Sequence, residues 1–264
     1  MSTPVIGRRR FLTYPLFVLI SRPLNALAEL RPTVGSYAAD IRIIYDMLSL
    51  ELRGTIEEFV DRPRGQYRIT AKGTGRGIEN HVDSSGVLRN GRWTPLRTES
   101  SFDVRGRHSR LEIAYDWAKR HIEYHARAET FFMRRLRVVD DVLPVPDWMH
   151  VDDVMSAALN FADNRWPAEA NGVHRTFVVR RRRADNERPD DVASSYKAET
   201  VPLDLRIISS PSSESTGLFD LSGFSSWAKP SEPARIVFSE NRRPQVVEMS
   251  LILGTSVTIR FWAI

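Results

Sequence analysis

The chain has 264 residues, 42% of them hydrophobic, and its 38 basic and 33 acidic residues give a formal net charge of +5. This hydrophobic content is enough for an ordinary globular core, which excludes disorder throughout the chain. The sequence contains no cysteine, which excludes disulfides, thiolate metal sites, thiol nucleophiles and attachment of a lipid to cysteine.

Residues 1–28 have the pattern of a cleavable export signal. Two consecutive arginines, Arg8 and Arg9, are followed after one residue by Phe11 and Leu12, which begin an apolar stretch of ten residues. A helix of that length spans about 15 Å, about half of a hydrocarbon core. The stretch therefore predicts a signal rather than a permanent membrane span.

The same residues resemble a twin-arginine signal, in which two arginines, any residue and Phe-Leu precede a modestly apolar core. Small residues at Ala26 and Ala28 lie at the positions that a signal peptidase reads, so we expect cleavage after Ala28. The resemblance implies passage through the twin-arginine translocase in the folded state and a periplasmic location. A general secretory signal with several arginines is the alternative.

Most of the net positive charge belongs to this N-terminal segment. Residues 1–28 hold four basic residues and no acidic one, so the rest of the chain has 34 basic residues against 33 acidic ones. Nucleic acids are bound through an excess of Lys and Arg that neutralises phosphates. The near-neutral remainder therefore predicts no nucleic-acid partner.

From Ser36 onward, short alternating segments separated by turn residues predict antiparallel β structure. The strands that we expect are 37–43, 48–56, 66–71, 111–117, 121–126, 176–180, 203–208, 234–238, 245–253 and 256–262. In the hairpin that begins at residue 111, Leu111, Ile113, Tyr115 and Trp117 fall on one face. One side of this hairpin should therefore be buried.

One segment has helical periodicity instead. Its apolar side chains recur at Val151, Val154, Met155, Ala158, Leu159 and Ala162. Asp152 and Asp153 suit the first turn of a helix over about 151–162. The predicted fold class is mainly β, an antiparallel curved sheet or half-barrel with this one amphipathic helix packed on it. It forms a single β-rich domain over 29–264, with a charged loop at about 181–195.

The order of these elements resembles DUF3108, a bacterial family of exported proteins known only as a domain of unknown function. The likeness rests on short motifs at 37–43, 50–56, 115–116, 151–158, 242–248 and 254–257. The resemblance implies a periplasmic antiparallel sheet curved round a helix, similar to the half-barrels that carry lipids or lipoproteins between bacterial membranes. It brings no catalytic residues with it.

A candidate metal site consists of His121, Glu123 and His125. Alternate side chains of a strand share a face, and two imidazoles with a carboxylate can bind a divalent metal. A metal-dependent enzyme would follow from this interpretation, and a solvated polar face is the alternative. The glycine-rich segment 72–77 is basic but lacks the Lys-Ser/Thr ending of a phosphate-binding loop, so a β turn is expected there.

The densest positive charge is a candidate anion-binding run formed by Arg180, Arg181, Arg182 and Arg183. Guanidinium groups could bind lipid headgroups, lipopolysaccharide phosphates or an acidic partner, as in an envelope assembly factor. The alternative is a solvated loop, with its charge offset by acidic residues at Asp185, Glu187, Asp190 and Asp191.

The leading functional hypothesis is an exported, non-catalytic protein without a cofactor that binds an apolar or lipid-like ligand inside its curved sheet, or docks on an envelope partner. Seven aromatic residues are candidates to line such a pocket: Phe59, Trp93, Phe102, Trp117, Phe131, Phe132 and Phe161. Packing in an ordinary core explains them equally well.

Overall fold

The computed structural model describes most of the chain beyond residue 31. The described residues are 32–43, 45, 47–130, 132–184, 187–188, 190–208, 214–221, 228–229 and 232–263. The chain divides into two compact units, Met1–Leu30 and Arg31–Ile264, and everything below concerns the second. The predicted signal residues, which fall outside the described ones, are Arg8, Arg9, Phe11, Leu12, Ala26 and Ala28.

Most described residues lie in β-strands, with a single helix, α1 (Val154–Ala162), in the described part of the chain. The strands are β1 (Thr33–Ile43), β2 (Leu48–Asp61), β3 (Gln66–Gly75), β4 (Ile78–Arg89), β5 (Arg92–Val104), β6 (Arg107–Asp116), β7 (His121–Glu129), β8 (Leu136–Pro144), β9 (Val173–Arg181), β10 (Ala198–Ile208), β11 (Ser215–Phe219), β12 (Ala234–Phe238), β13 (Pro244–Ser250) and β14 (Ser256–Trp262). The sequence therefore folds as a mainly β protein, as predicted.

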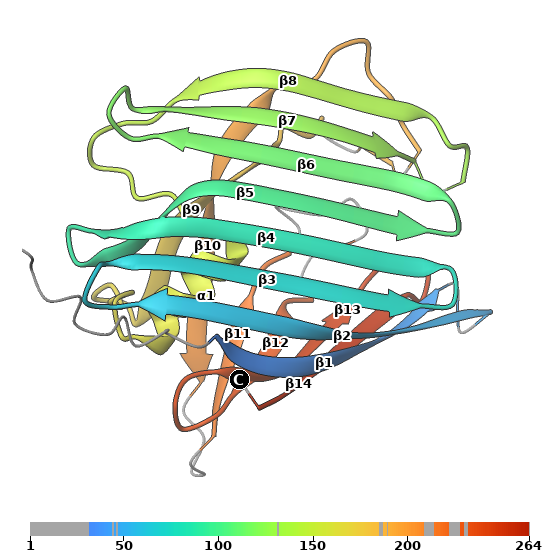
Figure 1. Ribbon diagram of the computed structural model, residues 1–264. Helices are drawn as coiled ribbons and strands as arrows, with labels where there is room; N and C mark the ends of the chain where they lie inside the picture. The colour runs from blue at the N-terminus through green and yellow to red at the C-terminus, as the bar shows by residue number, and fades with distance from the viewer. Residues whose placement is uncertain are drawn as a thin grey trace, which may run out of the picture. The chain divides into compact units, whose positions relative to one another are not determined.

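The described strands form one 14-stranded sheet, in which consecutive strands pair in antiparallel fashion except β8 and β9. Its order runs from β8 back to β1, then from β14 back to β9, because β1 pairs with β14. The first and last strands thus meet in the middle of the sheet, and β8 and β9 are its edges. Figure 1 shows β3 to β8 as one wall, with β9 to β13 behind it.

The sheet curls until its two edges approach each other. On β8, the Asp141 carboxylate accepts a hydrogen bond from the backbone amide of Ala198 at 2.9 Å and pairs with Lys197 Nζ at 3.1 Å. Between the edges, Val151 forms a parallel bridge with Phe177 of β9. The predicted curved antiparallel sheet is confirmed, and we call it the curled sheet.

Alternation along each strand separates an inner face from an outer face. On β2, Leu50 and Leu52 are buried, whereas Glu51 and Arg53 between and beside them are exposed. The predicted hairpin behaves in the same way, since its apolar side chains at Ile113, Tyr115, Trp117, Ile122 and Tyr124 are all buried. The inner face therefore carries the core, and the outer face is polar.

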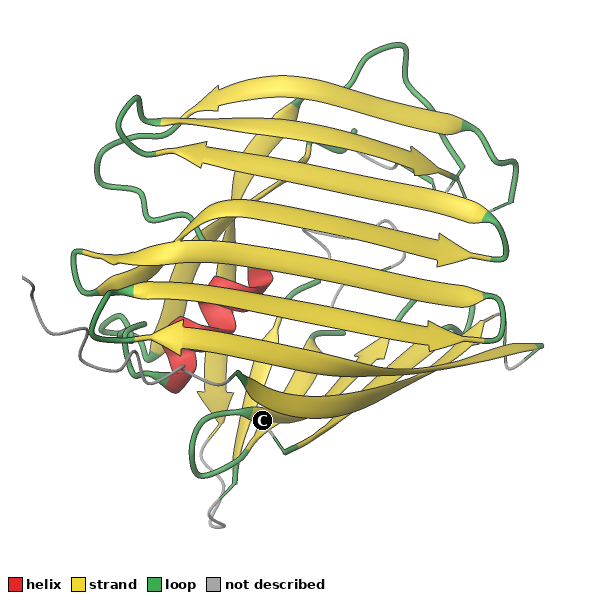
Figure 2. Cartoon of the chain, in the orientation of Figure 1, coloured by secondary structure: helices red, strands yellow, loops and turns green. Residues whose placement is uncertain are grey.

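Helix α1 lies on the inner face, between the two walls (Figure 2). Leu159 packs with residues of β1 to β5, and Ala157 and Phe161 pack with Leu205 and Phe238 of β10 and β12. The predicted amphipathic helix is confirmed, although it begins later than expected, at residue 154. Among the described residues, no helix has the length and apolar character that crossing a membrane requires.

Candidate binding site inside the curled sheet

The start of α1 is fixed by a capping box. Asp153 is the N-cap residue, and one oxygen of its carboxylate accepts a hydrogen bond from the Ser156 amide at 2.6 Å. The Ser156 hydroxyl oxygen accepts in return from the Asp153 amide at 3.0 Å. A side chain at this position satisfies amides that the helix itself leaves unpaired. Asp153 therefore caps the helix, and neither aspartate lies in its first turn.

The other oxygen of Asp153 ties the helix to the sheet. It accepts hydrogen bonds from the hydroxyls of Ser84 on β4, at 2.5 Å, and Thr98 on β5. Burial raises the pKa of the Asp153 carboxyl, while the hydrogen bonds from Ser156, Ser84 and Thr98 act in the opposite direction. The inner face of these two strands is polar at this point because it binds the helix cap.

Asp152 is completely buried and joins further elements. Five side chains approach its carboxylate within 3.1 Å, namely His150, Ser156, Asn160, Arg92 and Thr176. Asn160 also binds the backbone of Trp93 twice, at 2.8 Å in each case. A buried charge needs such a set of partners. The two carboxylates hold α1 against β4, β5 and β9, and their donors occupy them fully.

The inner face is less well filled beyond the helix, along β5, β6 and β7. Phe102 is the cross-strand partner of Asn80 and Ser109, and Asn80 accepts a hydrogen bond from the buried Tyr37 at 2.6 Å. This register places the Phe102 ring on the inner face, yet it is 42% exposed. At the helix, the inner residue Trp93 has no exposed surface.

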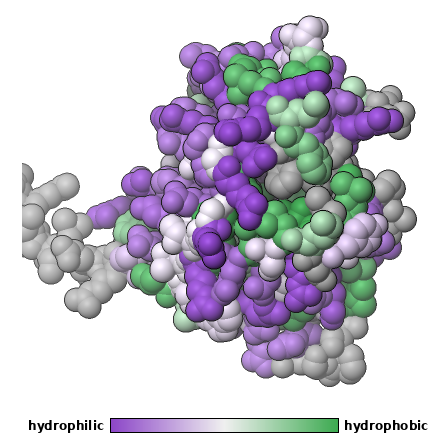
Figure 3. Space-filling view, turned by 90° about the vertical axis from the view of Figure 1, so that its right-hand side faces the viewer, coloured by the Kyte–Doolittle hydropathy of each residue, from purple (hydrophilic) through white to green (hydrophobic). Residues whose placement is uncertain are grey.

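Small side chains explain the space beside Phe102. Its row continues through Ser109 to Ala128, and Leu111 and Ala126 form the next row on the same face. All four are partly exposed. Figure 3 looks toward this end of the strands and shows apolar surface near its middle. We call the inner surface formed by Phe102, Ser109, Leu111, Ala126 and Ala128 the open end. Its described side chains are apolar or carry a hydroxyl, so it can accept an uncharged, apolar group.

Of the seven aromatic candidates, Phe102 alone combines an inner position with an exposed ring among the described residues. Trp93, Trp117 and Phe161 are core residues, as the alternative interpretation held. Phe59 is on the outer face as the partner of Arg68. Phe132 lies in a loop, and Phe131 is not among the described residues, so neither is placed on the inner face.

The candidate metal residues share the outer face of β7 but do not converge. His121 Nε2 lies 3.5 Å from Glu123 Oε1, whereas His125 Nδ1 lies 2.9 Å from Asp140 on β8. Within the described ranges, no group of three or more such side chains is placed to hold a metal ion.

The arginine run is paired with acidic side chains. Arg180 binds its cross-strand partner Glu199 through two nitrogens at 2.9 and 2.6 Å, and Arg182 reaches the second oxygen of the same carboxylate at 3.3 Å. Arg181 binds both oxygens of Glu187 at 2.7 and 2.5 Å and stacks on Tyr196 at 4.6 Å. Three of the four guanidinium groups are therefore engaged within the protein.

Of the acidic residues expected to offset the run, Glu187 does so. Burial alone would raise the pKa of Glu187, but hydrogen bonds and charge from Arg181, together with Arg137, hold it below its ordinary value. Asp190 instead accepts hydrogen bonds from backbone amides at 132 and 133. The second offsetting residue, Glu199, follows from strand register, which the sequence alone does not give.

The glycine-rich segment 72–77 does not form a phosphate-binding loop. It continues β3 as far as Gly75, and the turn follows at Gly77, which has a φ of +71°. Gly73 lies on the inner face, where a Cβ would come within 2.6 Å of Asn80 Oδ1 and of Leu52. Lys72 and Thr74 point to the outer face. The expectation of a β turn is confirmed at the end of this segment.

No family model and no curated protein matches this sequence. Among solved structures, the chain is similar to a beta-barrel-like protein of domain of unknown function DUF1849 from Brucella abortus. The TM-score is 0.43 and the identity 9%, over 88% of this chain and 97% of that one. The likeness to DUF3108 stays a prediction from short motifs.

Proposed function

We propose that this protein is exported to the periplasm through the twin-arginine translocase and acts there as a non-catalytic binding protein. Its ligand is apolar or lipid-like and enters the open end of the curled sheet. Phe102 is the observation that carries this proposal. A phenylalanine side chain that is turned inward is normally buried, and exposing it costs about 1.5–3 kcal/mol.

The arrangement of polar groups supports binding rather than chemistry. Asp152 and Asp153 are buried carboxylates beside the helix, and both are occupied in holding α1. The helix fills the other end of the interior, which leaves a ligand the space beside Phe102. The ligand would therefore lie against Phe102, Leu111 and Ala126, with the Ser109 hydroxyl as a polar contact.

One experiment tests export and binding together. The full-length chain is produced in a bacterium, the periplasmic fraction is collected, and the protein is measured by denaturing and native mass spectrometry. We expect the mass of a chain that begins at Glu29 and, under native conditions, an added mass that organic solvent extracts. Full-length protein confined to the cytoplasm would contradict the export, and Arg8→Lys with Arg9→Lys should produce that result.

Binding is then located with a matched pair of variants. N-phenyl-1-naphthylamine is an uncharged apolar probe that becomes fluorescent in apolar sites. We expect Phe102→Ala to weaken its binding about tenfold, which corresponds to about 1.4 kcal/mol of lost contact. Phe132→Ala also removes an exposed phenylalanine, from a loop, and should leave binding unchanged. Equal affinities in both variants would overturn the assignment of the site.

A further inference from the structure

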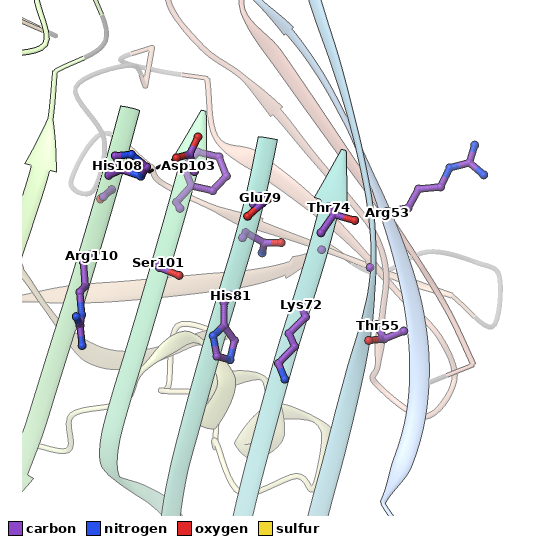
Figure 4. A pocket seen from close by; sticks show the side chains of 15 residues that line it. Arg53, Thr55, Lys72, Thr74, Glu79, His81, Ser101, Asp103, His108 and Arg110 are labelled. Carbon is purple, nitrogen blue, oxygen red and sulfur yellow. Dashed lines mark ion pairs between the residues drawn. The ribbon is translucent and has the colours of Figure 1, made fainter. Parts of the chain in front are cut away.

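The outer face of β2 to β6 carries a trough that the proposed function does not use. It has a volume of about 700 Å³ and is formed by two rows of side chains that cross five strands. Figure 4 shows both rows, with the backbone of the residues between them as the floor. One row contains Thr55, Lys72, His81, Ser101 and Arg110, and the other Arg53, Thr74, Glu79, Asp103 and His108.

Strand register builds the first row, which we call the basic row. Lys72 pairs with His81, His81 with Ser101, Ser101 with Arg110, and Arg110 with Arg127 of β7. Neighbouring strands are about 4.8 Å apart, so these residues form a line about 19 Å long from Lys72 to Arg127. Since two arginines face each other directly, the row contains a repulsion that folding alone does not favour.

The charges of this row are not compensated within the described structure. Lys72, Arg110 and Arg127 have no hydrogen-bond or ion-pair partner among the described residues. The adjacent acidic residues are already engaged. Asp83 binds Arg68 and Thr70, and a single arginine, Arg97, binds both Glu99 and Glu112 at 2.6 Å.

The opposite row gives the trough a second kind of contact. Asp103 pairs with His108 at 2.6 Å, and Glu79 stands exposed beside it with no partner among the described side chains. Carboxylates repel phosphates but accept hydrogen bonds from hydroxyl groups. The two rows include no Phe, Tyr or Trp side chain on which a base could stack. These properties disfavour a nucleic acid and favour a ligand with both acidic groups and hydroxyls.

We propose that this trough is a second binding site, for an acidic oligosaccharide that lies across the strands. Its carboxylate or phosphate groups contact Lys72, His81 and Arg110, and its hydroxyls bind Glu79 and Ser101. The lining of the trough includes Phe102 and Ser109, which also border the open end on the opposite face, so the two sites adjoin each other across the sheet.

Fluorescence anisotropy with a labelled hexagalacturonate tests the proposal on the whole mature protein. We expect hexagalacturonate to bind, and the affinity to fall as NaCl is added. The double variant Lys72→Gln with Arg110→Gln should bind hexagalacturonate at least tenfold more weakly than the wild type. Ser101→Glu, which places a negative charge in the middle of the basic row, should abolish it. The control is Arg182→Gln, which removes an exposed arginine that Glu199 already holds and should change nothing.

Two comparisons distinguish an acidic oligosaccharide from other ligands. Glu79→Leu removes the hydroxyl acceptors of this carboxylate together with its negative charge, so it should lower the preference for hexagalacturonate over a labelled oligothymidylate several-fold. Hexagalacturonate should also bind at least tenfold more tightly than a neutral dextran of equal length. The proposal is overturned if the double variant binds as the wild type does, if dextran binds equally, or if oligothymidylate binds more tightly than hexagalacturonate.

Discussion

Two concentrations of positive charge on this protein differ in how far the fold compensates them. The arginine run from 180 to 183 is contiguous in sequence, but Glu187 and Glu199 bind three of its guanidinium groups. The basic row is dispersed over residues 72 to 127, and its Lys and Arg side chains have no partner among the described residues. Density of charge along a chain is therefore a poor guide to the charge that a surface offers.

The difference has a geometric cause. Adjacent residues of a strand point to opposite faces, so Arg180 and Arg181, the last two residues of β9, cannot belong to one surface. Side chains that are cross-strand partners, by contrast, stand about 5 Å apart on the same face. Arg180 and Glu199 meet in this way, as do Lys72 and His81. Strand register thus neutralises positive charge at Arg180 and gathers it in the basic row.

Removing the acid that neutralises the run should have the largest effect on stability. The Glu187 side chain is 4% exposed and lies against Arg181 and Arg137, whose side chains are 16% and 12% exposed. Because Glu187→Gln leaves these buried charges without their anion, we expect a loss of about 3 kcal/mol in urea unfolding. Glu248→Gln, at an exposed pair with Arg235, should cost less than about 0.5 kcal/mol. Similar losses in both variants would show that the run is not held by a buried pair.

Lowering the pH should remove the stabilisation by Glu187 gradually, because it protonates the carboxylate. A carboxylate with a pKa below its unfolded value stabilises the fold above that value and loses this contribution as the pH falls through the folded pKa. The ordinary value for Glu187 is 4.5, and its folded pKa is lower. We therefore expect the stability difference between wild type and Glu187→Gln to be constant at neutral pH and to shrink as the pH falls below 4.5. A difference that persists unchanged at pH 2 would contradict this.

Much of the fold follows from alternation in the sequence, although β4, β5, β8 and β11 were not predicted. The hairpin of β6 and β7 was predictable because its inner residues at 111, 113, 115, 122, 124 and 126 are all apolar. β4 was not, since its inner face carries Asn80, Ser84 and Gly86, which meet Tyr37, Asp153 and Tyr67. These inner residues, of which Ser84 binds the helix cap, removed the apolar pattern by which a strand is recognised.

The sites were less predictable than the strands, because each depends on register. Phe102 was one of seven aromatic candidates, and only its pairing with Asn80 and Ser109 separates it from the core residues. In the sequence, Lys72 is one residue of a glycine-rich segment. In the sheet it shares a row with His81 and Arg110, which belong to other strands. The expectation for that segment was a β turn, and only the strand register shows that Lys72 stands beside His81.

The smallest predicted effect bears most directly on the difference between the two regions. Arg110 faces Arg127, and neither has an acidic partner among the described residues. Arg110→Gln should therefore raise the free energy of unfolding by about 0.2–1 kcal/mol at low salt, a gain that 1 M NaCl removes by screening. Arg181→Gln should destabilise, since it deprives buried Glu187 of its partner. Loss of stability in both variants would mean that Arg110 is held within the fold after all, and the basic row would then be an ordinary paired surface.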